Sequence, residues 1–183
     1  VGLLSQGGFI KGVNNLFTDC GETCGAFTLG GKIVMHLSTF TNYWSNGSFR
    51  QGASVFVSDW YESAGGIIQH RPFHEETEFR NCIVWGNNAS LNDFDELVSN
   101  ILDPSYYTDQ IFHSCALDVQ DLDFPYNLIN SDCTLDQAPP FQSELNRNFR
   151  LEGNSTIWNG ISSIPPFEAT DVSTDLDGSP RST

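Results

Sequence analysis

The sequence is poor in positive charge. Lysine occurs only twice in 183 residues, and eight basic residues stand against 23 acidic ones, so the formal net charge is −15. A surface of this charge repels the phosphate backbone of nucleic acids and offers little attraction to anionic lipid headgroups. The composition therefore argues against a nucleic-acid partner and against adsorption to a membrane surface.

Long apolar runs and helical periodicity are also missing. The sequence contains no stretch of about 18 apolar residues, so it predicts no membrane-spanning helix. Apolar residues form short runs that end at Gly, Asn or Ser, and they do not recur at helical spacing. Such runs are typical of buried strands and argue against an alternation of strands and helices. A chain of this length is most simply one domain.

The C-x-x-C pattern of redox and zinc sites is lacking as well. The five cysteines are Cys20, Cys24, Cys82, Cys115 and Cys133, and no two of them form a C-x-x-C pattern. Their odd number leaves at least one without a partner within the chain. Cys82 and Cys115 occupy the same position of a repeated phrase, which favours two stacked, buried side chains over a disulfide or a metal site. A disulfide between Cys20 and Cys24 stays open.

What the sequence does contain is a phrase that returns. Residues 79–84 read aromatic, polar, small polar, Cys, apolar, aliphatic, and the same order comes back at 112–117, an offset of 33 residues. Weaker copies stand at 35–40 and 12–17. An offset of this size is typical of stacked structural repeats. The phrase predicts coils of β-strands that place similar side chains at the same corner, and it predicts one strand over 79–85. An antiparallel sandwich is the structural alternative.

The stretch FRNCIVWGN at 79–87 resembles the N-C-I-I-W-G-N phrase of bacterial right-handed parallel β-helix proteins of the pectate-lyase-like superfamily. The segments NFRL at 148–151 and DLDGSPR at 175–181 are similar to the closing phrases of that superfamily. The resemblance implies an all-β fold, a right-handed parallel β-helix (solenoid) with inserted loops. It also implies that the chain is the C-terminal part of a longer β-helix. The chain departs from the pattern before Phe141, where Ala138, Pro139 and Pro140 replace the usual Asp-Pro.

The resemblance divides the chain into coils over 1–152, with insertions near 58–78 and 86–110, and an irregular tail over 153–183 that wraps the helix. Its superfamily includes lyases, hydrolases, adhesins and inert scaffolds, so the shared phrases specify a fold more than an activity. We expect a non-catalytic scaffold, secreted or on the outer cell surface of a bacterium, that is structural or adhesive. Its inserted loops would bind a glycan or a surface protein. The alternatives are a polysaccharide lyase or glycoside hydrolase acting on an acidic polysaccharide, and a subunit of a surface assembly.

Two aromatic pairs are the predicted ligand-binding residues. Tyr43 and Trp44 precede one turn-rich segment, and Trp60 and Tyr61 open the first insertion. Exposed Trp and Tyr rings stack on the faces of sugars and anchor protein partners. The sequence therefore places ligand binding on these four side chains, while their packing within the fold is the competing interpretation.

An enzymatic role would draw on acidic residues and a cation. Asp93, Asp95 and Glu96 form a carboxylate cluster, and Arg80 lies in the repeated phrase in line with His36 and His113. Lyases need a base and a cation, and glycoside hydrolases need two carboxylates. Because 23 acidic residues produce accidental clusters, these residues are candidates and no catalytic residue is predicted outright.

One short acidic loop has the composition of a calcium site. Asp175 and Asp177 alternate before Gly178, and alternating carboxylates can face one hard cation where a glycine permits a sharp turn. No glutamate stands at the twelfth position, as an EF-hand loop would require. The sequence therefore predicts no cofactor, with calcium at Asp175 and Asp177 as the alternative.

Overall fold

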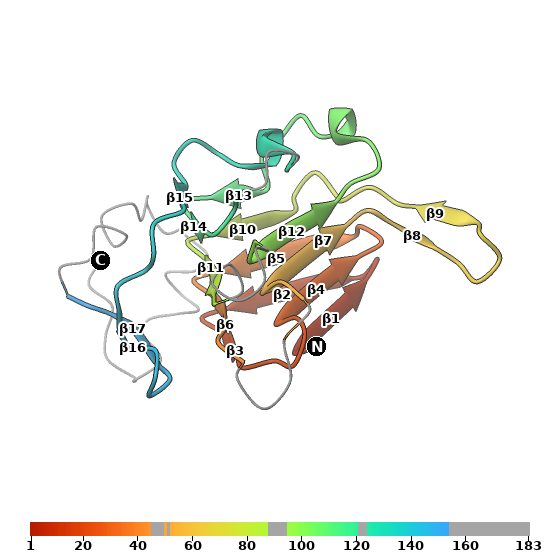
Figure 1. The fold of residues 1–183 in the computed structure, drawn as a ribbon. Helices are drawn as coiled ribbons and strands as arrows, with labels where there is room; N and C mark the ends of the chain where they lie inside the picture. Colours follow the sequence, from red (N-terminus) through yellow and green to blue (C-terminus); the bar gives the residue numbers. More distant parts are fainter. Residues whose placement is uncertain (45–49, 51, 88–94, 121–123, 154–183) are drawn as a thin grey trace.

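The computed structural model describes residues 1–44, 50, 52–87, 95–120 and 124–153, and most of its regular structure is β-strand (Figure 1). Three parallel sheets hold most of the strands. In order across each sheet, sheet A contains β1 (Leu3–Gln6), β4 (Gly25–Thr28), β7 (Val55–Ser58) and β12 (Leu97–Asn100). Sheet B contains β2 (Phe9–Val13), β5 (Lys32–His36), β10 (Glu78–Arg80) and β13 (Phe112–His113). Sheet C contains β3 (Leu16–Thr18), β6 (Thr39–Asn42), β11 (Ile83–Gly86), β14 (Ala116–Leu117) and β15 (Thr134–Leu135).

The chain visits the three sheets in turn. It runs through β1, β2 and β3, then β4, β5 and β6, then β7, β10 and β11, and then β12, β13 and β14. Hydrogen-bonded neighbours within a sheet therefore come from successive passes of the chain, and all pairings within the three sheets are parallel. The prediction of an all-β chain with parallel sheets is confirmed, and the antiparallel sandwich is wrong.

The four copies of the repeated phrase lie in register. In sheet B, Arg80 pairs with His113 on one side and with His36 on the other, and His36 pairs with Val13. Phe79 in the same way faces Phe112 and Met35. The predicted stacking of equivalent residues is therefore confirmed for all four copies. Similar side chains repeat because each occupies the same place in its own pass.

The single strand expected over 79–85 is two strands. β10 ends at Arg80 and β11 begins at Ile83, and between them Asn81 has a φ of 54°. The equivalent residues Asn14, Leu37 and Ser114 also have positive φ. A residue in this left-handed region turns the chain sharply, so each copy of the phrase bends from sheet B into sheet C. The expectation was wrong because no Gly or Pro marks the bend.

Stacked aromatic rings fill the space between the sheets. Phe79 and Phe112 are stacked with centroids 5.0 Å apart, and Phe27 meets Phe79 edge to face at 5.2 Å. Cys82 and Cys115 are 1% and 2% exposed and belong to the same core. Their predicted role as stacked, buried side chains is confirmed. Truncating one such phenylalanine to alanine typically lowers the free energy of unfolding by about 3–5 kcal/mol, so these rings contribute a large part of the stability.

Four shorter elements lie outside the parallel sheets: the hairpin of β8 (Trp60–Glu62) and β9 (Ile68–His70), the 3₁₀ turns η1 (Pro104–Tyr106) and η2 (Tyr126–Leu128), and the antiparallel pair β16 (Phe141–Ser143) and β17 (Asn148–Leu151). The β8–β9 hairpin projects well away from the sheets (Figure 1). Within the described residues, no helix has the length and apolar character required to span a bilayer.

Candidate ligand-binding site at the hairpin corner

Two connections from sheet A to sheet B lie side by side. The first, between β7 and β10, carries the β8–β9 hairpin, and the second, between β12 and β13, carries η1. We call residues 59–75 and 100–111 together the hairpin corner. Hydrogen bonds between the two connections hold it together, as the following contacts show.

Asp59 is the anchor of the hairpin corner. Its side chain is fully buried and contacts residues of both connections. It accepts hydrogen bonds from the Leu102 backbone N–H at 2.9 Å and from the Tyr107 hydroxyl at 2.9 Å, and Nε2 of His70 lies 3.1 Å away. A buried carboxylate is tolerated where its oxygens are satisfied in this way. Asp59 therefore fixes the base of the hairpin against the segment that follows β12.

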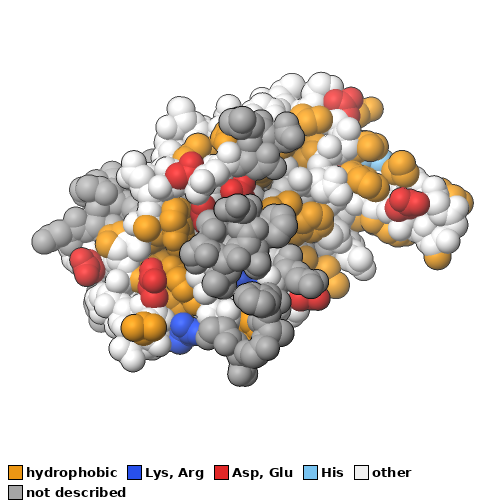
Figure 2. Space-filling model, in the orientation of Figure 1, with side chains coloured by type: hydrophobic (Ala, Val, Ile, Leu, Met, Phe, Trp, Pro, Cys, Tyr) orange, Lys and Arg blue, Asp and Glu red, His pale blue; other side chains and the backbone are white. Residues whose placement is uncertain are grey.

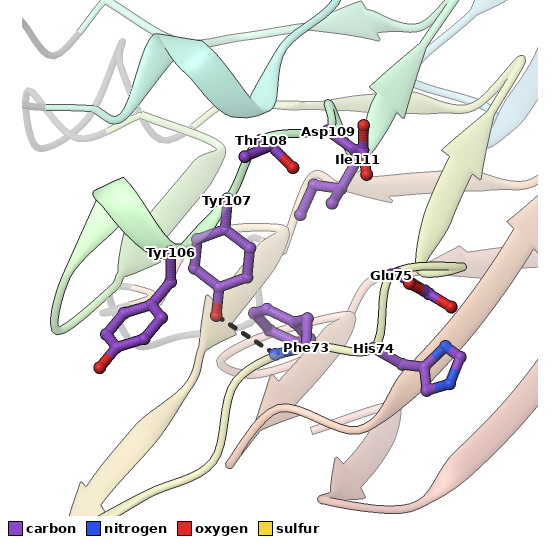
Figure 3. A pocket seen from close by; sticks show the side chains of 8 residues that line it. All are labelled: Phe73, His74, Glu75, Tyr106, Tyr107, Thr108, Asp109 and Ile111. Carbon is purple, nitrogen blue, oxygen red and sulfur yellow. Dashed lines mark hydrogen bonds between the residues drawn. The ribbon is translucent and has the colours of Figure 1, made fainter.

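Tyr107 extends this network toward the next strand. Its hydroxyl accepts the backbone N–H of Phe73 at 3.2 Å, drawn as the dashed line in Figure 3, and the two rings are 6.1 Å apart. Burial, together with the hydrogen bond to Asp59, raises the pKa of Tyr107 well above its ordinary value. The hydroxyl therefore keeps its proton at neutral pH and acts as a fixed donor.

Large apolar side chains are exposed around this anchor. The exposed ones on the two connections are Tyr61, Ile67, Ile68, Leu102 and Tyr106. Figure 2 shows apolar side chains along the projecting hairpin, interrupted by acidic and polar groups. Tyr106 is 63% exposed, and its ring lies 5.6 Å from the His70 ring. The half-buried Trp60 is held by a hydrogen bond from Nε1 to Asn100 Oδ1, at 3.1 Å. Trp60 is therefore held in place, and the Tyr106 ring is accessible.

A small cavity of about 110 Å³ lies between the two connections. Its lining consists of Phe73, His74, Glu75, Tyr106, Tyr107, Thr108, Asp109 and Ile111 (Figure 3). Cavities that enclose a drug-sized ligand measure roughly 300–1,000 Å³, so this one can take only part of a larger molecule. The exposed carboxylates of Glu75 and Asp109 and the Thr108 hydroxyl supply hydrogen-bond acceptors beside aromatic rings. The arrangement suits a ligand with hydroxyl groups and an apolar face.

The structure separates the two predicted aromatic pairs. Trp60 and Tyr61 lie on β8 at the hairpin corner. Tyr43 is buried, where its hydroxyl donates to Glu144 at 2.8 Å and its ring stacks on Phe149 at 5.6 Å. Burial, then the Glu144 carboxylate, raises the pKa of Tyr43. Trp44 is half-buried. The four residues therefore do not form one surface, and their role in ligand binding stays a prediction.

Glu96 lies in a buried ion pair. The Arg50 guanidinium contacts both carboxylate oxygens, at 2.5 and 2.8 Å, and the backbone N–H and hydroxyl of Ser54 donate to Oε2 at 2.9 and 2.7 Å. Neither charged side chain is exposed to solvent. Gly86 makes this close packing feasible, since a Cβ there would stand 2.2 Å from Glu96 Oε1. These contacts suit a role in holding successive passes together.

The other catalytic candidates lie apart from one another. Asp95 is half-buried next to Glu96, just before β12 of sheet A. Arg80 lies in sheet B and donates to Glu78 at 2.8 Å. Hydrogen bonds from His36 and then Arg80 lower the pKa of Glu78 to about 2. Near Glu96, burial and then the Glu96 carboxylate raise the pKa of Asp118 to about 6. The structure does not bring Arg80 together with the carboxylate cluster.

Three predicted residues fall outside the described part of the chain: Asp93, Asp175 and Asp177. Among the described residues, no group of three or more His, Cys, Asp and Glu side chains is arranged to hold a metal ion. Calcium binding at Asp175 and Asp177 therefore stays a prediction.

Sequence reasoning did not single out Asp59, Tyr106 or Tyr107. Each is a common residue in a polar segment, and only the stacking of two connections from different passes brings them together. The one local signal was the position of Asp59 directly before the aromatic pair. Comparisons with protein-family models, with curated proteins and with solved structures gave no match for this chain.

Proposed function

We propose that the three parallel sheets are the faces of a right-handed parallel β-helix, similar to those of the pectate-lyase-like superfamily. Support comes from the order of the strands, which visit the sheets in the same sequence on each pass. Right-handed connections between parallel strands are the rule in about 98% of cases. The recurring phrase at 79–84 and 112–117 supports the same assignment, because equivalent residues pair in register.

On this scaffold, the hairpin corner binds a glycan with neutral sugar units, and the protein is a non-catalytic module that is secreted or on the outer surface of a bacterium. The observation that carries this proposal is the exposed Tyr106 ring at the outer edge of a cavity that Glu75, Thr108 and Asp109 also line; the ring lies on the far side of Tyr107 from these polar residues (Figure 3). An aromatic ring offers a flat apolar face for a sugar, and carboxylates are strong acceptors for hydroxyl groups. Because the chain carries a net charge of −15, a neutral glycan suits it better than an acidic one.

The alternative is a lyase or hydrolase that acts on an acidic polysaccharide. Such an enzyme needs a base or acid within reach of the substrate and cations to hold developing negative charge. Glu96 is already held by Arg50, and Arg80 by Glu78. The raised pKa of Asp118 favours an acid–base role, but this residue is only 3% exposed and therefore out of reach of a polysaccharide. The catalytic alternative is therefore the less well supported one.

A protein partner, or a surface assembly of several subunits, would use the hairpin differently. Ile67 and Ile68 are exposed at its far end, and exposed aliphatic side chains favour protein contacts over sugars. This candidate function makes no use of the cavity at Tyr106, so substitutions there separate it from glycan binding.

The test applies the labelled protein to an array of neutral and acidic oligosaccharides, and incubates the same oligosaccharides with the protein for product analysis by mass spectrometry. We expect retention on a subset of neutral glycans with every oligosaccharide recovered intact. Unsaturated or shortened products would establish the catalytic alternative. Binding to no glycan would overturn the proposal for the hairpin corner.

A further inference from the structure

Three cysteines form a column in the core. Ile83 pairs with Ala116, and Ala116 pairs with Thr134; the residues just before them are Cys82, Cys115 and Cys133. Cys115 and Cys133 are in direct contact, because the Cys115 backbone N–H donates to Cys133 Sγ at 3.4 Å. Adjacent strands are about 4.8 Å apart, within the Cα separation of roughly 4.4–6.8 Å that a disulfide spans. Neighbouring thiols in this column are therefore placed to bond.

The surroundings of the column distinguish its members. Cys82 and Cys115 are buried, and their thiols donate to the carbonyl oxygens of Met35 and Phe79, at 3.2 and 3.3 Å. Cys133 is only half-buried and lies at the end of the column, beside the short strand β15. An oxidant that reaches the column meets Cys133 first, and the nearest thiol to Cys133 is that of Cys115. Cys82 is shielded on both sides by the core.

The remaining two cysteines form a second pair. Cys20 and Cys24 lie close together, since burial and then the nearby Cys20 thiol raise the pKa of Cys24. Gly2 packs directly over them, since a Cβ at this position would stand 2.8 Å from Cys20 Sγ and 2.8 Å from the Cys24 carbonyl oxygen. Cys24 is buried, whereas Cys20 is half-buried. Like Cys133 and Cys115, this pair joins a partly exposed thiol, which a reagent can reach, to a buried thiol beside it.

We propose that the chain takes up two disulfides in an oxidising compartment, Cys20–Cys24 and Cys115–Cys133, and keeps Cys82 as a free thiol. With a low-molecular-weight disulfide such as oxidised glutathione, the Cys133 thiolate attacks one sulfur and releases one glutathione thiol. The Cys115 thiolate then attacks Cys133 Sγ in the mixed disulfide and releases the second. The two cysteine thiols are oxidised to the disulfide, and one glutathione disulfide is reduced to two glutathione thiols, which take up the two protons that the cysteines lose. The same exchange at Cys20 and Cys24 consumes a second equivalent.

The pairing accounts for the odd number of cysteines. It does not depend on the proposed glycan site, because none of the five cysteines lies at the hairpin corner. Burial, and the neighbouring thiol, raise the pKa of Cys24; contact with the Cys115 thiol, and burial, raise that of Cys133. Only a small fraction of either thiol is ionised at neutral pH, so exchange is slow there and the test is run at mildly alkaline pH.

The experiment treats the folded, reduced protein with oxidised glutathione, then unfolds it without reductant, alkylates every remaining thiol and maps the peptides by mass spectrometry. We expect one alkylated cysteine, Cys82, and linked peptides for both disulfides. An alkyl group or a retained glutathione at any other cysteine, or a disulfide that includes Cys82, would overturn the proposed pairing. Circular dichroism before the unfolding step confirms that the protein was folded during oxidation.

Two substitutions test the proposed disulfide pairing independently of the peptide map of the wild-type protein. Cys133→Ser should leave Cys115 as an alkylated thiol while the Cys20–Cys24 disulfide still forms. Cys82→Ala should leave both disulfides in place. A Cys82–Cys115 disulfide in the first variant, or the loss of either disulfide in a folded Cys82→Ala variant, would contradict the role given to the core.

Discussion

Removing one partner of the Arg50–Glu96 ion pair should destabilise the fold more than removing both. The pair joins two passes of the chain, and neither charged side chain has any exposed surface. The perturbation is a cycle of three variants: Glu96→Leu, Arg50→Met and the double variant. Each single variant leaves one charge in the interior without its partner, whereas the double variant leaves none.

The expected magnitude follows from the contacts. Loss of one member of a buried ion pair typically costs about 3–5 kcal/mol. Glu96→Leu also removes the acceptor of the Ser54 N–H and hydroxyl, and an unsatisfied buried donor costs about 1–3 kcal/mol. We therefore expect Glu96→Leu to lower the free energy of unfolding by about 4 kcal/mol or more. The double variant should recover most of the ion-pair loss, which corresponds to a coupling energy of about 3 kcal/mol.

Urea-induced unfolding, followed by circular dichroism and tryptophan fluorescence, measures these changes. The m-values show whether each variant unfolds in the same two-state manner as the wild type. The exposed pair of Lys32 and Glu76 is the matched control, and Glu76→Ala should leave the free energy of unfolding close to that of the wild type, because solvent screens an exposed ion pair. A Glu96→Leu variant as stable as that control, or a double variant whose loss equals the sum of the single losses, would refute the reasoning.

Three further predictions concern individual positions. Gly86→Ala should lower stability by about 1–3 kcal/mol, because the added Cβ would stand 2.2 Å from Glu96 Oε1. Gly65→Ala is the control, since a Cβ at that position would have no other atom within 4 Å. Equal denaturation midpoints for the two variants would contradict this prediction. Asp59→Asn should cost about 1–3 kcal/mol, because an amide cannot accept all the hydrogen bonds of the carboxylate, and it should weaken glycan retention; an unchanged midpoint would argue against its role as anchor. Burial, then the Glu96 carboxylate, raises the pKa of Asp118 from 3.8 to about 6, so ionisation of the unfolded state should make the wild type less stable as pH rises from about 4 to 6. Asp118→Asn should flatten that slope in urea titrations at several pH values, and an unchanged slope would show that other groups cause it.

The stacking of the repeated phrase was predictable from the sequence. Residues at the same place in successive passes share one environment, so the Phe79 and Phe112 pair and the Cys82 and Cys115 pair recur at a fixed offset. The period is visible because the packing constraint repeats with the chain. The bends were not predictable in the same way, because Leu37 adopts a positive φ that its residue type disfavours. Tertiary contacts decide such positions.

The hairpin corner shows why site prediction reached less far. The local pattern singled out Trp60 and Tyr61, since adjacent aromatic residues are conspicuous in any sequence. It could not reveal that Asp59 accepts hydrogen bonds from residues 43 and 48 positions later in the chain. Those contacts depend on how one inserted connection lies on the next. Glu96 was identified as a candidate by its type, but its burial against Arg50 depends on a residue in another pass.

Glycan retention by matched tyrosine variants tests the central claim most directly. Tyr106 is among the residues that line the cavity of the hairpin corner, and Tyr126, which is 40% exposed and lies on η2, is not. On an array of neutral oligosaccharides, Tyr106→Ala should lose much of the signal, since stacking on an aromatic face contributes about 0.5–1.5 kcal/mol beyond the apolar area that it buries, or roughly two-fold to ten-fold in affinity. Tyr126→Ala should bind as the wild type does. Equal retention by wild type and Tyr106→Ala, with both proteins folded, would contradict glycan binding at the hairpin corner.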